Sequence, residues 1–84
     1  MKNKYKIKVK QIDIERGVRQ DVCKCPVALA IRRVIKKAPI SVLGDYCIGV
    51  GSHQYAGPKK VGDFITVFDK GGEVKPFNFV MRMT

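Results

Sequence analysis

The sequence lacks most of the features by which an enzyme or a membrane protein is recognised. No apolar run approaches the roughly 20 residues of a membrane-spanning helix. The lysine-rich N-terminus has no apolar region behind it, so we expect a cytoplasmic protein rather than a secreted one. The seven Asp and Glu residues are scattered, and histidine occurs once. Because acid–base catalysis needs suitably paired groups, the sequence predicts no catalytic residue and no enzyme.

Three cysteines cannot all pair within one chain, and without a secretory signal we expect reduced thiols. Cys23, Cys25 and Cys47 could form a zinc site with His53, but the Cys-x-Cys spacing is tighter than the usual gap of about two to four residues. Cys25 is also a candidate reactive thiol at a helix N-terminus, with His53 as the only candidate base. Lone cysteines and histidines are more often structural, so the sequence predicts no metal site and no cofactor.

Positive charge, by contrast, is abundant and unevenly placed. Residues 1–37 hold twelve of the 17 Lys and Arg but only three of the seven Asp and Glu, so they carry nine of the ten net positive charges. Such asymmetry points to an anionic partner. The alternative is that the charge merely keeps a small domain in solution.

Residues 1–10 have the pattern of a strand with one buried and one solvated face. Tyr5, Ile7 and Val9 share one parity, which places them on one face. The other face carries five lysines, namely Lys2, Lys4, Lys6, Lys8 and Lys10. Alternate residues of a strand stand about 6–7 Å apart, which is close to the phosphate spacing of a nucleic-acid strand. The lysines therefore suit phosphate contact, and they equally suit the protection of an edge strand from pairing.

The segment 25–37 predicts the central helix of the domain. Its apolar residues recur at three- and four-residue intervals and form one stripe: Val27, Ile31, Val34, Ile35 and Ala38. Cys25 fits the N-cap and Pro26 the first helical position, while Pro39 ends the helix. The opposite side carries a second basic surface, formed by Arg32, Arg33 and Lys36 around Leu29. An apolar residue ringed by basic ones suggests a contact patch.

The rest of the chain completes an α+β domain over residues 1–84. The patterns predict a helical turn at 14–16 and strands near 41–43 and 46–50, with 53–56 as a further candidate strand and with candidate turns at Gly44-Asp45 and Gly51-Ser52. A helix at 58–70, opened by Gly57-Pro58 and ended by Gly71-Gly72, precedes a final strand at 77–83. In this last strand Phe77, Phe79 and Met81 are expected to face the helices, and Asn78, Val80 and Arg82 to face away with the lysines. We expect two helices packed on one face of a mostly antiparallel sheet, in the order β-α-β-β-α-β, with the ferredoxin-like arrangement as the candidate fold. In that arrangement the lysine strand and the basic helix face lie on opposite sides, so either one of them is the site or the protein sits between partners.

Two segments carry a resemblance to known proteins. One is Cys25–Ile31, Cys-Pro-Val-Ala-Leu-Ala-Ile, and the other is Phe64–Phe79, which ends Phe-Asp-Lys-Gly-Gly-Glu-Val-Lys-Pro-Phe-Asn-Phe. Together they resemble a family of small, mostly uncharacterised proteins encoded in phage genomes. The resemblance implies a phage-type accessory protein in the cytoplasm of its host cell, and it implies no particular activity.

These observations predict a basic, non-enzymatic binding protein. The first hypothesis is an accessory factor that binds an acidic surface on a host protein. The alternative is a nucleic-acid-binding module that contacts the phosphates of DNA or RNA through the lysine strand or the basic helix face. A thiol or zinc enzyme is a distant third hypothesis.

Overall fold

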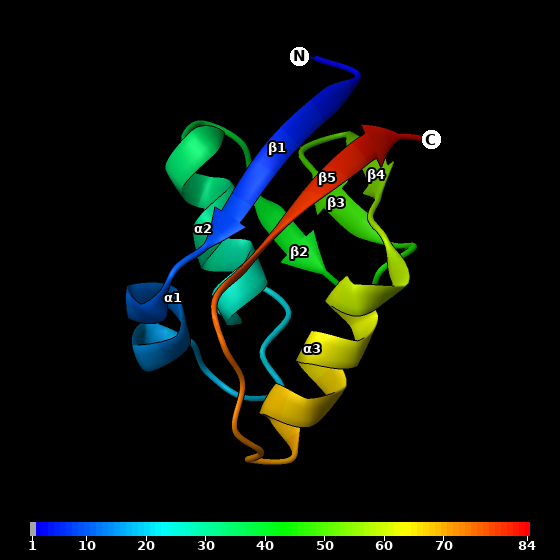
Figure 1. The fold of residues 1–84 in the computed structure, drawn as a ribbon. Coiled ribbons are helices and arrows are strands. Elements are labelled where there is room, and N and C mark those ends of the chain that lie inside the picture. The colour runs from blue at the N-terminus through cyan, green and yellow to red at the C-terminus, as the bar shows by residue number, and fades with distance from the viewer. Residues whose placement is uncertain (1) are drawn as a thin grey trace.

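Five antiparallel strands form one curled sheet, a half-barrel, in the computed structural model, which describes residues 2–84 (Figure 1). The strands are β1 (Lys4–Val9), β2 (Ile40–Val42), β3 (Ile48–Val50), β4 (His53–Ala56) and β5 (Phe77–Met83). Their order across the sheet is β1-β5-β4-β3-β2. β1 and β2 are therefore the two edges, although they belong to different halves of the chain.

Three helices accompany the sheet: α1 (Gln11–Arg16), α2 (Pro26–Val34) and α3 (Lys59–Asp69). α2 contacts both edge strands, β1 and β2, and so bridges the open side of the half-barrel. Cys25 is its N-cap and accepts a hydrogen bond at Sγ from the Ala28 N–H, and Pro26 begins the helix. Both predictions about this helix start are confirmed.

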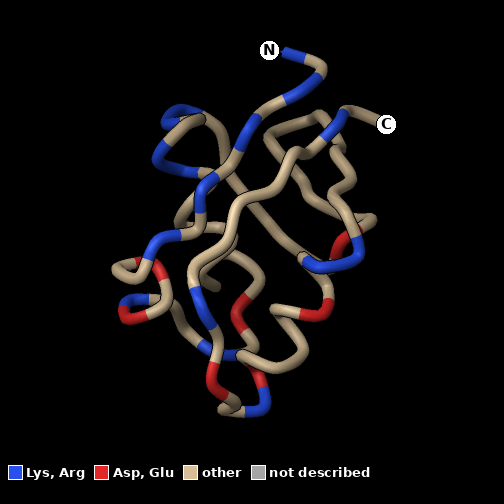
Figure 2. The backbone as a smooth tube through the Cα atoms, viewed as in Figure 1, with Lys and Arg blue, Asp and Glu red and all other residues tan. Residues whose placement is uncertain are grey.

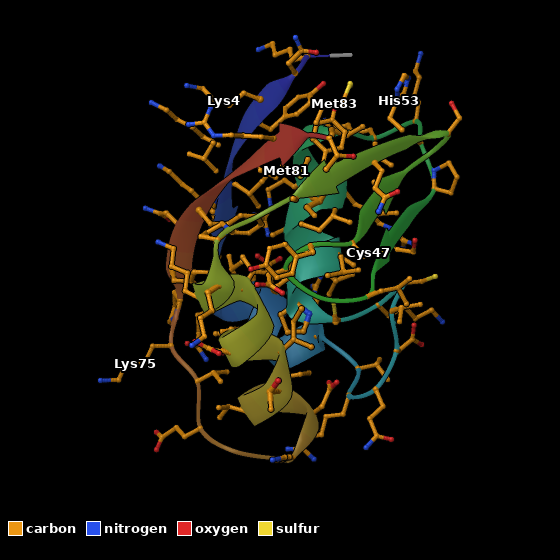
Figure 3. All side chains as sticks on the ribbon, turned by 90° about the vertical axis from the view of Figure 1, so that its right-hand side faces the viewer. Lys4, Cys47, His53, Lys75, Met81 and Met83 are labelled. Carbon is orange, nitrogen blue, oxygen red and sulfur yellow. The ribbon has the colours of Figure 1, made fainter. Side chains whose placement is uncertain are left out.

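One hydrophobic core fills the space between the sheet and the helices. The strand faces predicted to point inward do so: Ile7, Val9, Phe79 and Met81 are buried, and Tyr5 and Phe77 are partly buried against the core. Figure 3 shows Met81 within the side chains of the interior, whereas Lys4 projects away from it. The prediction of an apolar inner face and a basic outer face for β1 is confirmed.

The predicted length of the central helix is wrong, because α2 ends at Val34 and not at Lys37. Val34 is 47% exposed and leaves the predicted apolar stripe. Pro39 excludes Ala38 from helical geometry, and the β-branched pair Val34-Ile35 has low helix propensity. By leaving the helix early, the chain packs Ile35 and Ala38 against the core from a loop.

The α+β class and the antiparallel sheet are confirmed, but the ferredoxin-like order is not. Within residues 2–84 the sheet has five strands, where the predicted order has four, and β1 lies at an edge with β5 as its only strand neighbour. A third helix, α1, extends the predicted turn at 14–16. β3 is shorter than predicted, because it begins at Ile48, whereas β2 has its predicted length and begins one residue earlier, at Ile40. Tyr46 lies outside β3 and is 76% exposed, although its parity matched that of the buried Ile48.

Two glycines end elements where the sequence predicted turns. Gly51 has a φ of 61° in the turn between β3 and β4, and Gly71 has a φ of 81° just after α3. Both values lie in the left-handed region, which glycine adopts without steric cost. The hairpin and the end of the second predicted helix are therefore confirmed.

Candidate binding surface on the outer face of β1 and β5

The side chains of β1 and β5 that point away from the core form a continuous basic surface, which we call the outer face. The register pairs Lys4 with Arg82, Lys6 with Val80 and Lys8 with Asn78. Residues that are paired in an antiparallel ladder point to the same face of the sheet. The outer face thus consists of Lys4, Lys6, Lys8, Asn78, Val80 and Arg82.

A groove of about 690 Å³ lies across this face, between β5 and the start of α3. We call it the outer groove. Its cationic side chains are Lys6, Lys8, Lys60 and Arg82, and no carboxylate lines it. Val80, Ala56 and Pro58 supply apolar surface between these charges. A shallow apolar surface rimmed by cations suits a ligand that carries both apolar groups and negative charge.

The outer groove exists because β4 pairs with only part of β5. Tyr55 pairs with Met83 and Ala56 with Arg82, and then the chain turns away into α3. Gly57 makes this turn close to β5, since a Cβ atom at Gly57 would stand 3.4 Å from the Phe79 ring and 3.2 Å from Val61. The turn therefore forms one wall of the groove, and β1 and β5 form the other.

The positive charge of the outer face is not neutralised within the molecule. Over residues 2–84, the one ion pair joins Arg33 and Asp13, and neither residue lies on the outer face. Figure 2 shows basic positions along β1 and near the end of α2, with acidic positions concentrated in the lower part of the view. In Figure 3, Lys4 and Lys75 project to the same side, which extends the basic surface beyond β5.

Two of the predicted lysines lie beyond the ends of β1 and have local roles. The Lys2 N–H donates to the Tyr5 hydroxyl at 3.1 Å, and the Lys2 carbonyl accepts from the Tyr55 hydroxyl at 2.5 Å. The Lys10 N–H donates to Asp13 Oδ2 at 2.8 Å at the start of α1. These contacts use the main chain, and both residues are exposed at the margins of the outer face, where Lys2 Nζ lies 5.9 Å from the centroid of the Tyr5 ring.

The second predicted surface, on α2, is divided by the structure. Arg32 and Lys36 are exposed and Leu29 is half-buried. The Arg33 guanidinium pairs with the buried Asp13, and its Nη1 donates to the Lys8 carbonyl at 3.2 Å. Arg33 therefore ties α2 to β1 and α1. At this contact the predicted helix surface meets the main chain of β1, while Arg32 and Lys36 stay exposed on α2.

Arg33 and Arg32 are adjacent in the chain but are expected to differ sharply in their contribution to stability. Replacing Arg33 with alanine leaves the carboxylate of Asp13, whose side chain is 5% exposed, without its cation. We expect a loss of about 2 kcal/mol in the free energy of unfolding, below the value for a fully buried pair because Arg33 is partly exposed. Arg32→Ala, the matched control, should change it by less than about 0.5 kcal/mol. Urea unfolding of both variants checks this, and equal midpoints would contradict it.

The three cysteines and His53 form neither the metal site nor the reactive thiol that the sequence raised as alternatives. Within residues 2–84, no group of three or more His, Cys, Asp or Glu side chains is placed to hold a metal ion. Cys23 is exposed, Cys47 accepts a hydrogen bond from Gln54 Nε2 at 3.5 Å, and Cys25 is buried. Burial raises the pKa of the Cys25 thiol above its ordinary value of 9.0 and outweighs the main-chain N–H groups that act in the opposite direction. Cys25 is thus a protonated N-cap at neutral pH, which is contrary to the idea of a reactive thiol.

The buried thiol of Cys25 gives the stability a pH dependence of known sign. The thiol of the unfolded chain ionises near pH 9, whereas that of the folded protein stays protonated to higher pH. Its contribution to stability is therefore complete below pH 9 and is lost as the pH rises through the folded-state pKa. We expect the unfolding midpoint to fall more steeply above about pH 9 in the wild type than in Cys25→Ser. Parallel curves for the two proteins would contradict this assignment.

No helix formed by residues 2–84 is long and apolar enough to cross a bilayer. No family model, curated protein or solved structure matches the chain. The candidate site therefore rests on the geometry and charge of the outer face alone.

Sequence reasoning found part of this site and missed the rest. Lys6 and Lys8 were predicted from the parity of the first strand, and Arg82 was placed on the same face but not among the binding residues. Lys60 was missed, because it joins the groove only through the turn between β4 and α3. The dipeptide Gly57-Pro58 signalled that turn, but nothing in the sequence indicated that it packs beside β5.

Proposed function

We propose that this protein is a non-enzymatic binding protein whose outer groove engages an acidic segment of another protein. The observation that carries the proposal is the lining of the groove, in which four cations surround apolar surface and no carboxylate is present. Charge complementarity of this kind steers association and selects against basic partners. The apolar surface gives the partner's side chains an area to bury.

The resemblance of the Cys25–Ile31 and Phe64–Phe79 segments to phage-encoded proteins suggests the setting. An accessory protein of this type acts in the cytoplasm of its host, so the expected partner is a host protein with an acidic surface. Binding that depends on a few exposed cations is expected to weaken with salt, since the Debye length falls from about 10 Å at 0.1 M to about 3 Å at 1 M.

Nucleic acid is the competing partner, because Lys4, Lys6 and Lys8 repeat at a spacing close to that of phosphates. The outer face, as defined by six residues of β1 and β5, contains no aromatic side chain on which bases could stack, and this favours protein over single-stranded nucleic acid. Phe79 is 3% exposed, Tyr5 packs edge-on against Tyr55, and Phe77 packs against Phe64 and Phe79, so their rings serve the core.

Capture from a nuclease-treated bacterial lysate separates the two partners. We expect the immobilised protein to retain an acidic protein at low salt and to release it as salt rises. In parallel, gel shifts with generic single- and double-stranded DNA and RNA are expected to show no complex at protein concentrations that suffice for capture. If the protein binds nucleic acid tightly and retains no protein from the lysate, the proposal is wrong and the nucleic-acid hypothesis is favoured.

A further inference from the structure

The outer groove contains unpaired main-chain groups as well as charged side chains. Thr84 N–H donates to the Gln54 carbonyl at 3.0 Å, and Ala56 pairs with Arg82. Alternate residues of an antiparallel strand direct their main-chain groups to opposite sides. The even-numbered residues of β5 therefore face β4, and the odd-numbered ones face β1. The bond from the Met83 N–H to the Asn3 carbonyl, 2.7 Å long, agrees with this assignment.

In the described chain, β4 supplies a partner for only one of the even-numbered residues of β5, Arg82, and for Thr84 just beyond the end of β5. If β4 continued in the same register, Pro58 would lie opposite Val80. Pro58 has no N–H, and the chain turns there into α3. Within residues 2–84, the main-chain N–H and C=O groups of Val80 and Asn78 have no protein partner on this side. Both residues line the outer groove. The groove is thus a vacant strand position beside β5, at the place that β4 would occupy if it were longer.

We propose that the outer groove binds its partner by strand addition: an extended acidic segment pairs with Asn78 and Val80 of β5. This inference rests on the proposed function and specifies its mode. Main-chain hydrogen bonds would give the segment its register, as in other complexes formed by strand addition to a sheet. The rim cations would select its side chains.

The geometry also specifies the sequence pattern of the bound segment. A residue directly opposite Val80 or Asn78 turns its main chain toward β5 and its side chain to the outer face. There it meets the cations of Arg82, Lys6 and Lys8. Carboxylates are therefore favoured at every second position. The intervening residues direct their side chains to the opposite face, toward the start of α3.

The free edge of β1 is the weaker candidate for the same kind of pairing. Its outward main-chain groups belong to Lys4, Lys6 and Lys8, and the Lys8 carbonyl already accepts from Arg33. Lysines along an edge commonly discourage pairing. The other edge, at β2, is covered in part by the bond from the Val42 N–H to the Val22 carbonyl.

Two probe peptides test the proposal on the wild-type protein. The parent is a Thr-Glu repeat of about eight residues, long enough for one strand, and fluorescence anisotropy measures its binding. Methylating the main-chain nitrogens of the glutamates removes the hydrogen bonds to β5 and is expected to weaken binding about tenfold. Methylating those of the threonines, which face away from β5, should weaken it less than about twofold. Equal losses, or no binding of the parent peptide, would overturn strand addition.

Matched protein variants locate the pairing. Val80→Pro removes the N–H that faces the vacant position and leaves the odd-numbered ladder to β1 intact, whereas Val80→Ala keeps that N–H. We expect Val80→Pro to bind the parent peptide about tenfold more weakly than Val80→Ala, with circular dichroism to verify the fold of each. Lys6→Pro should bind the parent peptide no more weakly than Lys6→Thr. Weaker binding by Lys6→Pro would indicate that the peptide pairs with the free edge of β1 instead. If lysate capture succeeds while these variants and peptides show no difference, the proposed function stands and strand addition fails.

Discussion

Reversing the charge of Lys6, Lys8 and Arg82 together, by substitution with glutamate, is expected to abolish capture of the partner protein. The three cations line the outer groove and have no carboxylate partner within residues 2–84. Like charges brought together at an interface cost several kcal/mol, so the triple substitution should weaken binding at least about a hundredfold. The exposed positions of the three side chains make a change of fold unexpected.

The control for this experiment changes the same amount of charge elsewhere. Arg19, Lys24 and Lys70 are exposed, and none of them lines the outer groove. Their joint substitution with glutamate lowers the net charge equally and should retain most of the binding. If both triple variants lose binding to the same extent, total charge rather than the outer face determines association, and the proposed site is wrong.

Replacing Ile31 with alanine is expected to lower the free energy of unfolding by about 3 kcal/mol. Ile31 is completely buried on α2, the helix that bridges the two edges of the half-barrel. Its loss leaves a cavity beneath the helix that contacts both β1 and β2. For a domain of this size, a loss of about 3 kcal/mol corresponds to a fall of about 12–24 °C in Tm.

Val34→Ala is the matched control, because Val34 belongs to the same apolar stripe in the sequence but is 47% exposed in the structure. We expect it to change the free energy of unfolding by less than about 0.5 kcal/mol. Thermal unfolding of the two variants therefore tests directly which of these side chains of α2 packs into the core. A large loss at Val34 together with a small one at Ile31 would contradict the packing described for this helix.

The features predicted correctly from sequence are those set by residues close together in the chain. The alternation from Tyr5 to Val9, the Cys25-Pro26 helix start and the turn at Gly51 each depend on a few neighbouring side chains. The end of α2 was missed because it depends on tertiary packing, in which Ile35 and Ala38 contact the core from the loop after the helix. Helix propensity alone rarely decides such a case.

Strand order could not be predicted, because it depends on pairs that are distant in sequence. Ala56 meets Arg82 across the whole of α3, and Tyr5 meets Met81 from the opposite end of the chain. The outer groove is a consequence of these pairings. The lysines of β1 that line the groove could be predicted from the alternation of the first strand. The wall at Gly57 and the unpaired main chain of Val80 could not, because they depend on where β4 stops pairing with β5.

Backbone NMR of the labelled protein during titration with the Thr-Glu peptide tests the central claim most directly. The account predicts amide shift changes concentrated at Asn78 and Val80 of β5 and at Lys60, with smaller changes at Lys6 and Lys8 and none at the exposed loop residues Leu43 and Tyr46. Changes centred instead on Arg32 and Lys36, or spread evenly over all basic residues, would contradict the outer groove as the binding site.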